Sequence, residues 1–185
     1  LVNPIAIFYD YGREISVGDS WQNEYNDGIV LNENRNRIIK EIVAKYRVEG
    51  KKIMLLCKMI KHCEEFHKTI DDSELIYGGT DNDVRYDILE KFKAGDVQVL
   101  IGNLKIFNKG INLKNLDVLI NASGNAGEIT TVQSMGRILR KNPGKEEAIY
   151  IDFMDNGEYL KKHSLNRIAA LKDENYNVVI EKYQE

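Results

Sequence analysis

The chain has 185 residues, of which 43% are hydrophobic and 30% charged, and its net charge at pH 7 is only -3. This length predicts one domain, with or without an appendage, and the composition excludes a disordered protein. The near-balanced charge excludes a basic field over the whole protein, and no apolar run approaches the roughly eighteen residues of a membrane helix. With no signal-peptide pattern and only two cysteines, we expect a cytoplasmic protein without a membrane partner.

Residues 1–30 differ in pattern from the rest of the chain. Residues 5–9 fit a strand, but residues 11–28 are polar and irregular, with Gly12, Gly18 and Gly28 as breaks. The chain starts at Leu1 instead of Met, which is typical of an excised fragment. We therefore expect residues 1–30 to be a linker from a missing upstream part of the protein, and residues 31–185 to form the domain.

The rest of the chain alternates short apolar runs with amphipathic stretches of helical period. Asp81 is a good N-cap for one of these helices, and Gly95 a good stop for it. The pattern predicts an α/β fold, an open and mostly parallel sheet with helices on both faces, with ligands at the carboxyl ends of the strands. The predicted strands are residues 53–57, 75–77, 97–101, 116–121 and 148–152, with an edge strand at 176–180; the predicted helices are 36–48, 60–70, 84–94, 131–139 and 158–171.

The strongest local signal is the run QSMGRILR in the last helix before the fifth strand. Gln133, Gly136, Arg137 and Arg140 fall at i, i+3, i+4 and i+7, so they share one stripe of a helix. Two guanidinium groups beside a glycine suit a phosphate, because arginine offers planar and permanently charged donors. The alternative is a solvated basic helix end.

Two glycine-containing segments follow predicted strands. Residues 102–112 (GNLKIFNKGIN) are predicted as a loop that binds phosphate or sugar, beginning with Gly102 and Asn103. Residues 77–81 (YGGTD) open a helix whose N–H groups can hold an anion, with Arg85 one turn further on. In each case, the alternative is a turn that uses glycine for backbone reasons alone.

Other polar and aromatic residues are given structural interpretations. Cys57, His62, Cys63 and His67 do not have the paired spacing of a zinc site, so we expect no metal. Trp21 and the tyrosines are interpreted as packing residues instead of platforms for stacked bases.

The order of CKMIKHCEEF, YGGTDNDVR, the GNLKIFNKGINLKNL run and QSMGRILR resembles motifs IV, IVa, V and VI of superfamily 2 helicases. The resemblance covers roughly residues 30–155. It is to the second RecA-like lobe, the helicase C-terminal domain, and is nearest to phage and mobile-element DNA helicases of the UvsW type. It implies a RecA-like fold and a partner lobe N-terminal to this one in the same polypeptide.

The resemblance also implies roles for single residues. Arg140 matches the arginine finger and Arg137 the second arginine that reaches the γ-phosphate of ATP, which is bound with Mg²⁺ mainly by the first lobe. The nucleotide-side positions are Gln133, Gly136, Gly110 and Asn112, where Asn112 replaces the Asp of many relatives. The positions that touch nucleic acid are Gly79, Thr80, Arg85, Gly102 and Asn103, where Gly102-Asn103 replaces a common Ala-Thr.

No phosphate-binding G-x-x-x-x-G-K-[ST] loop occurs in the chain. We therefore expect the isolated chain not to hydrolyse ATP. Residues 97–141 carry six Lys or Arg against two acids, a charge that suits phosphate. Two functions remain open: the second motor lobe of an ATP-dependent helicase or translocase acting on nucleic acid, with DNA favoured, or a stand-alone α/β module that binds phosphate or a nucleotide.

Overall fold

The computed structural model describes residues 3–12, 20–108, 111, 113, 115–127, 130, 131, 133, 135, 136, 145 and 147–184. The strands are β1 (Asn3–Asp10), β2 (Ile53–Cys57), β3 (Ser73–Ile76), β4 (Val99–Asn103), β5 (Val118–Asn121), β6 (Glu147–Phe153) and β7 (Asn177–Lys182). The helices are α1 (Trp21–Tyr25), the π-helix η1 (Asn26–Val30), α2 (Glu33–Val48), α3 (Ile60–Thr69), α4 (Asn82–Ala94), α5 (Leu104–Asn108) and α7 (Glu158–Asp173).

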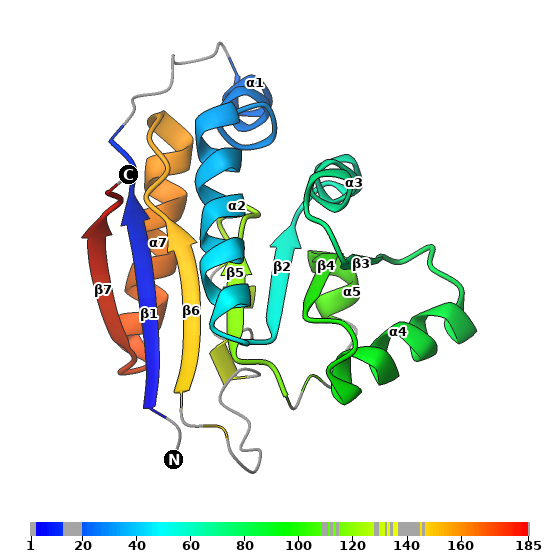
Figure 1. Cartoon of the computed structure of the whole chain (residues 1–185). Coiled ribbons are helices and arrows are strands. Elements are labelled where there is room, and N and C mark those ends of the chain that lie inside the picture. The colour runs from blue at the N-terminus through cyan, green and yellow to red at the C-terminus, as the bar shows by residue number, and fades with distance from the viewer. Residues whose placement is uncertain are drawn as a thin grey trace.

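The strands form one seven-stranded sheet in the order β3-β4-β2-β5-β6-β1-β7. Every strand pairing in it is parallel, so β1, β2 and β7 point the same way in Figure 1. The predicted α/β fold with a parallel RecA-like sheet is confirmed, and the predicted strand 176–180 is the edge strand β7. Because the strands are parallel, their carboxyl ends share one edge of the sheet.

Residues 1–30 contribute more to the sheet than a linker would. β1 lies between β6 and β7, pairing Ala6 with Tyr150 on one side and with Val178 on the other. Ala6 and Phe8 are fully buried. The stretch that was expected to be irregular is helical from residue 20 onward. Ser20 caps α1, and η1 follows α1 directly. Tyr25 and Ile29 there pack with Leu160 in a small cluster that sequence periodicity cannot reveal.

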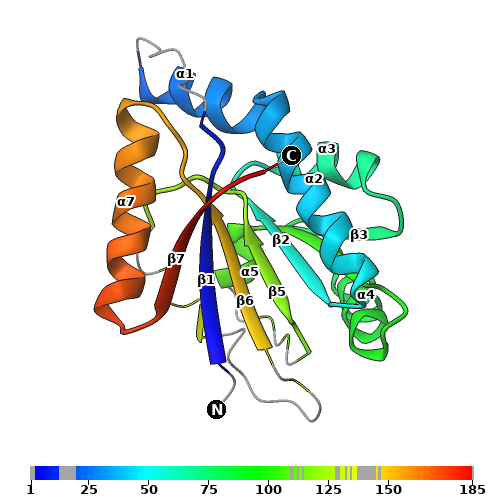
Figure 2. The ribbon, with the colours of Figure 1, turned by 60° about the vertical axis from the view of Figure 1, so that its left-hand side comes forward.

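Helices cover both faces of the sheet, as predicted. In β2, Ile53, Leu55 and Cys57 face one cluster and Met54 and Leu56 the other, which is the alternation of a strand buried on both sides. Figure 2 shows α7 on one side of the sheet and α2 on the other. The first cluster is covered by α2 and α3 and the second by α4, α5 and α7, through residues such as Ile39, Phe66, Phe92, Ile106 and Leu171.

The termini of α4 are as predicted. The Asp81 carboxylate accepts a hydrogen bond from Asp83 N at 2.9 Å, and Gly95 ends the helix with φ at +92°. The segment after β4 differs from the predicted loop, because Gly102 and Asn103 belong to the strand and α5 follows at once. Asn103 explains the difference: its side-chain oxygen accepts a hydrogen bond from Ile106 N and so starts a helical turn.

Candidate functional site

The loop after β5, residues 122–127, is held by side chains from three helices. Arg35 of α2 donates to the carbonyl of Ala122 at 3.1 Å, and the Tyr25 hydroxyl of α1 donates to the carbonyl of Ser123 at 2.6 Å. Arg167 of α7 donates to the carbonyl of Asn125 at 2.5 Å. The loop leads from the carboxyl edge of the sheet into the segment that carries Gln133. Its position is therefore fixed by tertiary contacts.

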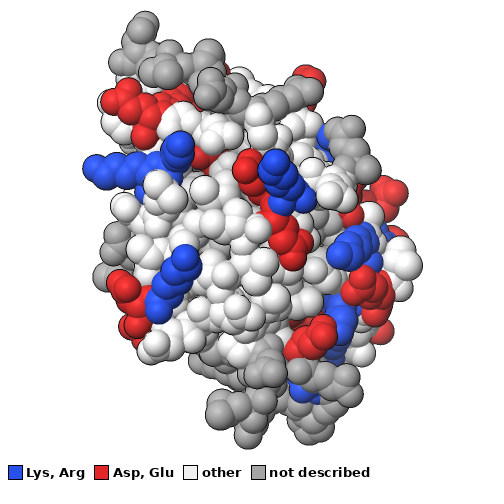
Figure 3. Space-filling view, turned by 90° about the vertical axis from the view of Figure 1, so that its left-hand side faces the viewer, with Lys and Arg blue, Asp and Glu red and all other residues white. Residues whose placement is uncertain are grey.

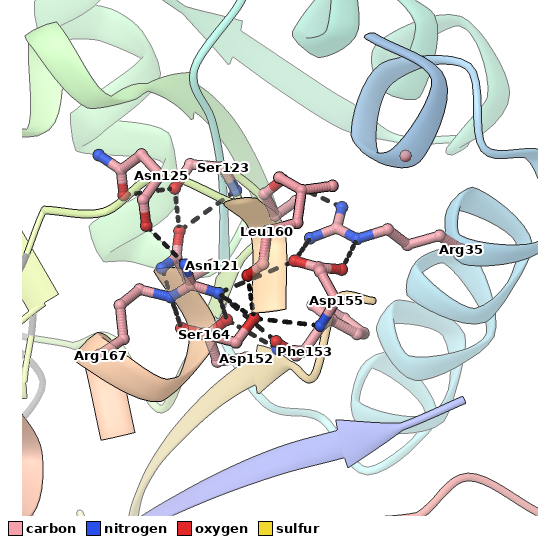
Figure 4. A network of polar contacts seen from close by, with 12 residues as sticks. Arg35, Asn121, Ser123, Asn125, Asp152, Phe153, Asp155, Leu160, Ser164 and Arg167 are labelled. Atoms are coloured by element: carbon pink, nitrogen blue, oxygen red, sulfur yellow. Dashed lines mark hydrogen bonds and ion pairs between the residues drawn. The ribbon is translucent and has the colours of Figure 1, made fainter. Parts of the chain in front are cut away.

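Two buried ion pairs anchor the arginines (Figure 4). Arg35 meets the Asp155 carboxylate through Nε at 2.7 Å and Nη2 at 3.3 Å, and Arg167 meets Asp152 through Nε at 2.9 Å and Nη2 at 2.8 Å. All four side chains are fully buried. Burial alone would lower the pKa of each guanidinium, but the facing carboxylate outweighs it and raises the pKa of both. Both arginines therefore stay charged inside the protein.

Neutral groups satisfy the remaining atoms of this network. Asn121, the last residue of β5, donates to Asp152 at 3.1 Å and accepts from the Ser123 hydroxyl at 2.6 Å. The Tyr11 hydroxyl donates to Asp155 at 2.8 Å. Burial, followed by the charge of Asp155, raises the pKa of Tyr11, so the phenol remains a donor. Buried ion pairs persist only when their remaining lone pairs are bonded in this way.

Part of the QSMGRILR segment is described. Thr130, Thr131, Gln133, Met135 and Gly136 are helical, as predicted. Met135 is fully buried in the core, whereas Gln133 and Gly136 are exposed. The helix thus presents the predicted Gln133 and Gly136 stripe away from the core. Arg137, Arg140, Gly110 and Asn112 lie outside the described residues.

Gly102 and Asn103 are the last two residues of β4, at the carboxyl edge of the sheet. A Cβ at Gly102 would be 2.8 Å from Met54 Cε and 3.1 Å from the carbonyl oxygen of Ile76, so a larger residue would have to displace these neighbours. Asn103 is 3% exposed, and its side-chain oxygen starts α5. The structure gives both residues a structural role, and their contact with nucleic acid stays a prediction.

The turn after β3 brings together Gly79, Thr80 and Arg85. The Thr80 hydroxyl accepts from Tyr77 N at 2.9 Å, and Arg85 Nη2 donates to the Thr80 carbonyl at 2.9 Å. Gly78 and Gly79 are exposed and Arg85 is half-buried. Within the described part of the chain, the buried Arg85 Nε has no hydrogen-bond partner. The turn is therefore an exposed helix N-terminus with a cation beside it, which is the predicted arrangement for an anion.

The cysteines and histidines considered for zinc serve other contacts. Cys57 and Cys63 are free and buried, His62 Nε2 lies 2.9 Å from the Asn36 side-chain oxygen, and His67 Nδ1 lies 3.0 Å from the Ser73 hydroxyl. Burial, with the charge of Arg35, lowers the pKa of His62 to about 3. Over the described residues no group of three His, Cys, Asp or Glu is placed to hold a metal ion.

The face of the molecule in Figure 3, which carries β7, shows no patch of purely basic or purely acidic side chains among the described residues. Basic and acidic side chains are interspersed over the described residues of the side that carries β7. Within the parts of the chain that the structure describes, none of the helices has the length and apolarity needed to span a bilayer.

Sequence reasoning missed the four charged residues of the buried network. Arg35 and Arg167 lie in polar stretches of their helices, NENRNR and KKHSLNR, and look like surface cations. Their partners are 120 and 15 residues away along the chain. The available signal was Asp152, a carboxylate at the end of an otherwise apolar strand, which needs a buried cation.

Comparison with known proteins assigns the chain to a family. Residues 33–142, more than half of the chain, match the helicase conserved C-terminal domain. The chain belongs to this family. The expected resemblance to superfamily 2 helicases of the UvsW type is confirmed. The matched residues run from the start of α2, past β5, to the end of the QSMGRILR segment.

Individual relatives agree. The ATP-dependent DNA helicase UvsW of Enterobacteria phage T4 is 25% identical over 198 residues, covering 95% of this chain and 39% of the relative. The DNA 3'-5' translocase XPB2 of Sulfurisphaera tokodaii is 27% identical over 138 residues, covering 75% of this chain and 30% of the relative. The chain thus spans well under half the length of these curated relatives.

Solved structures show the same fold. The crystal structure of T4 UvsW matches with a TM-score of 0.76 at 23% identity, over 98% of this chain and 41% of that one. Dbp5 of S. cerevisiae, bound to RNA and ADP BeF3, matches with a TM-score of 0.64 at 13% identity, over 97% of this chain and 41% of that one. At these identities the match concerns the fold alone.

Proposed function

We propose that this chain is the second motor lobe of an ATP-dependent helicase or translocase that acts on nucleic acid, with DNA as the favoured substrate. The observation that carries the proposal is the family match over residues 33–142. Such a lobe closes on a first RecA-like lobe of the same polypeptide around ATP. Cycles of closing and opening then move the enzyme along a strand.

On the nucleotide side, the held loop 122–127 supports the proposal. It fixes the start of the helix that exposes Gln133 and Gly136, and Arg137 and Arg140 continue the same sequence motif. In the proposal, Arg140 is the arginine finger and Arg137 a second contact to the γ-phosphate. Gln133, Gly136, Gly110 and Asn112 line the nucleotide, while the first lobe binds most of the ATP and its Mg²⁺.

On the nucleic-acid side, the exposed turn with Gly79, Thr80 and Arg85 supports contact with strand phosphates, because it offers backbone N–H groups and a cation without base-reading elements. DNA is favoured because UvsW and XPB2 are named for action on DNA. RNA is named for Dbp5, matched at 13% identity, and for the putative ATP-dependent RNA helicase L396 of Acanthamoeba polyphaga mimivirus, whose match covers 78% of this chain against 95% for UvsW.

The test is ATP hydrolysis by the polypeptide that joins this chain to a first lobe, at saturating single-stranded DNA or RNA. Arg140→Ala should lower turnover on the order of 10³-fold or more, because an arginine finger stabilises charge that develops only in the transition state. Arg140→Lys should recover little, since the planar fork is lost. Lys141→Ala, the matched control at the next position, should stay near wild type.

The same proteins are followed by DNA-binding anisotropy and melting temperature, both of which should change little with Arg140→Ala. Near-normal turnover in Arg140→Ala would show that Arg140 is not the finger, and a collapse in melting temperature would assign it a structural role. Stronger stimulation by RNA than by DNA would reverse the substrate preference.

A further inference from the structure

A cavity of about 280 Å³ opens at the carboxyl edge of the sheet, beside the held loop. It is formed by α1, the residue after β2, the loop after β5 and α7, elements that adjoin at the upper end of the molecule in Figure 1. The lining residues that matter here are Trp21, Tyr25, Lys58, Asn125, Tyr159 and His163. None of them is among the site residues predicted from sequence.

The aromatic residues of this cavity fall into two classes. Tyr25 is 6% exposed and its hydroxyl holds the Ser123 carbonyl, so packing explains it. Trp21 and Tyr159 are each 41% exposed, although they are large apolar groups. Trp21 packs edge-on against Tyr25, with 6.2 Å between the ring centres, yet both Trp21 and Tyr159 keep surface that packing inside the described chain does not use.

Lys58 supplies a positive charge at the same place. Its ammonium nitrogen lies 4.7 Å from the centre of the Trp21 ring and 4.9 Å from that of Tyr25. Lys58 is exposed and follows β2 directly, at the edge where strand ends meet. The indole of Trp21 stays partly accessible with Lys58 in place. One ligand can therefore contact both the Lys58 ammonium and the Trp21 ring.

His163 adds an unused polar atom. Its Nδ1 is buried and has no hydrogen-bond partner among the described residues, a condition that is rare in folded proteins. Burial is the main cause that lowers the pKa of His163, so the ring is neutral at pH 7. His163 thus lines the cavity as a neutral ring and adds no charge to it.

We propose that this cavity binds one nucleobase of a single-stranded nucleic acid, stacked on Trp21 and Tyr159, with its phosphate on Lys58. The size of the cavity, its two accessible aromatic rings and its cation match a base joined to a phosphate, and stacking of this kind tolerates any base. The inference rests on the proposed function. It adds a site for one base to the proposed contacts with the phosphates of the nucleic acid.

The experiment uses the fact that Trp21 is the only tryptophan of the chain. The 185-residue chain is titrated with oligothymidylate of about ten nucleotides, a length within the usual range of such sites. Trp21 fluorescence and the anisotropy of a labelled oligonucleotide are followed in parallel. We expect saturable quenching of Trp21 with the same dissociation constant as the anisotropy change, and about 5-fold or greater weakening, without quenching, for an abasic oligonucleotide of equal length.

Variants test the ring and the cation separately. Tyr159→Ala should weaken binding about 5-fold or more, since one stacking surface is lost. Leu165→Ala, which removes a 48% exposed side chain from the same helix outside the cavity, should have no effect. Lys58→Ala should reduce the slope of log affinity against log salt by about 1, as for the loss of one phosphate contact.

The outcomes separate the cavity from the proposed function. An anisotropy change without Trp21 quenching, or equal affinity for the abasic strand, overturns the base site and leaves nucleic-acid binding intact. Absence of any anisotropy change at low salt counts against nucleic-acid binding by this chain. Quenching of Trp21 by a separately expressed first lobe, with none by the oligonucleotide, assigns the cavity to contact between lobes and overturns the proposal.

Discussion

Two segments at the carboxyl edge of the sheet, the loop after β5 and the turn after β3, are built in opposite ways. The loop at residues 122–127 depends on side chains from α1, α2 and α7, which bind three of its carbonyl groups. The turn from Tyr77 to Asp81 depends on its own residues and on Arg85, with Thr80 bonded to Tyr77 in both directions. The first is fixed by the whole fold, and the second only by its neighbours in sequence.

This difference matches two kinds of task. Under the proposed function, the helix with Gln133 faces a separate lobe and needs a fixed direction, which the buried ion-pair network that holds the preceding loop provides. Under the same proposal, the turn after β3 contacts a nucleic-acid strand and needs accessible N–H groups and a cation, and the exposed Gly78 and Gly79 leave these N–H groups open. Substitutions in the loop's supports should therefore affect stability, whereas those in the turn should affect binding.

The largest effect is expected from Arg167→Ala. It leaves Asp152 as a buried carboxylate without its bidentate partner, and it frees the Asn125 carbonyl. Removal of one member of a buried pair costs about 3–5 kcal/mol in the free energy of unfolding. Urea denaturation of the 185-residue chain measures it.

The matched control removes both charges. In Arg167→Met with Asp152→Leu no unpaired ion is left, so part of the lost stability should return. Recovery should be incomplete, because the buried donors of Asn121 and Tyr150 lose Asp152 as their acceptor. A loss below about 1 kcal/mol for Arg167→Ala would indicate that water reaches Asp152 and that the network does not hold the loop.

A smaller effect is expected when the same substitution is made in the sheet and in the turn. Gly102→Ala places a Cβ 2.8 Å from Met54 Cε and 3.1 Å from the backbone oxygen of Ile76, and overpacking of this kind costs about 1–3 kcal/mol. At Gly78 a Cβ meets no atom of the described residues within 4 Å, so Gly78→Ala should change the free energy of unfolding by less than about 0.5 kcal/mol. Equal effects at the two positions would remove the distinction between the regions.

The sequence predicted what depends on local pattern. The apolar runs gave the parallel strands of the sheet, and Asp81 and Gly95 gave the ends of α4, because period, caps and glycine act over a few residues. It did not predict α5, since the side chain of Asn103 turns a polar loop sequence into a helix start. It also missed α1, whose burial depends on contact with α7.

The residues of the candidate site were likewise predicted where they depend on local sequence and missed where they depend on distant contacts. Gln133 and Gly136 are exposed on a helix and Arg85 is beside its turn, as helical spacing indicated. The pairing of Arg35 with Asp155 joins residues far apart in the chain, and nothing in either local sequence distinguishes it from a surface charge. The cavity with Trp21 and Tyr159 likewise exists only because α1 and α7 adjoin.

The smallest effect on stability, and a defined effect on binding, is expected from Arg85→Gln. Arg85 is half-buried and its only hydrogen bond among those described is to the Thr80 carbonyl, so the free energy of unfolding should fall by about 1 kcal/mol or less. If the guanidinium contacts one phosphate, its loss weakens binding of single-stranded DNA about equally for all sequences and reduces the slope of log affinity against log salt by about 1.

Lys91→Gln is the control for this last experiment. Lys91 is an exposed cation in the last turn of the same helix, so it removes the same net charge far from the turn. Anisotropy titrations at several salt concentrations should show a reduced slope for Arg85→Gln and an unchanged slope for Lys91→Gln. Equal reductions would mean that only the overall charge of the lobe attracts the strand. An unchanged slope for Arg85→Gln would leave Arg85 as a structural brace of the turn, and the turn would then resemble the loop after β5 more than a binding surface.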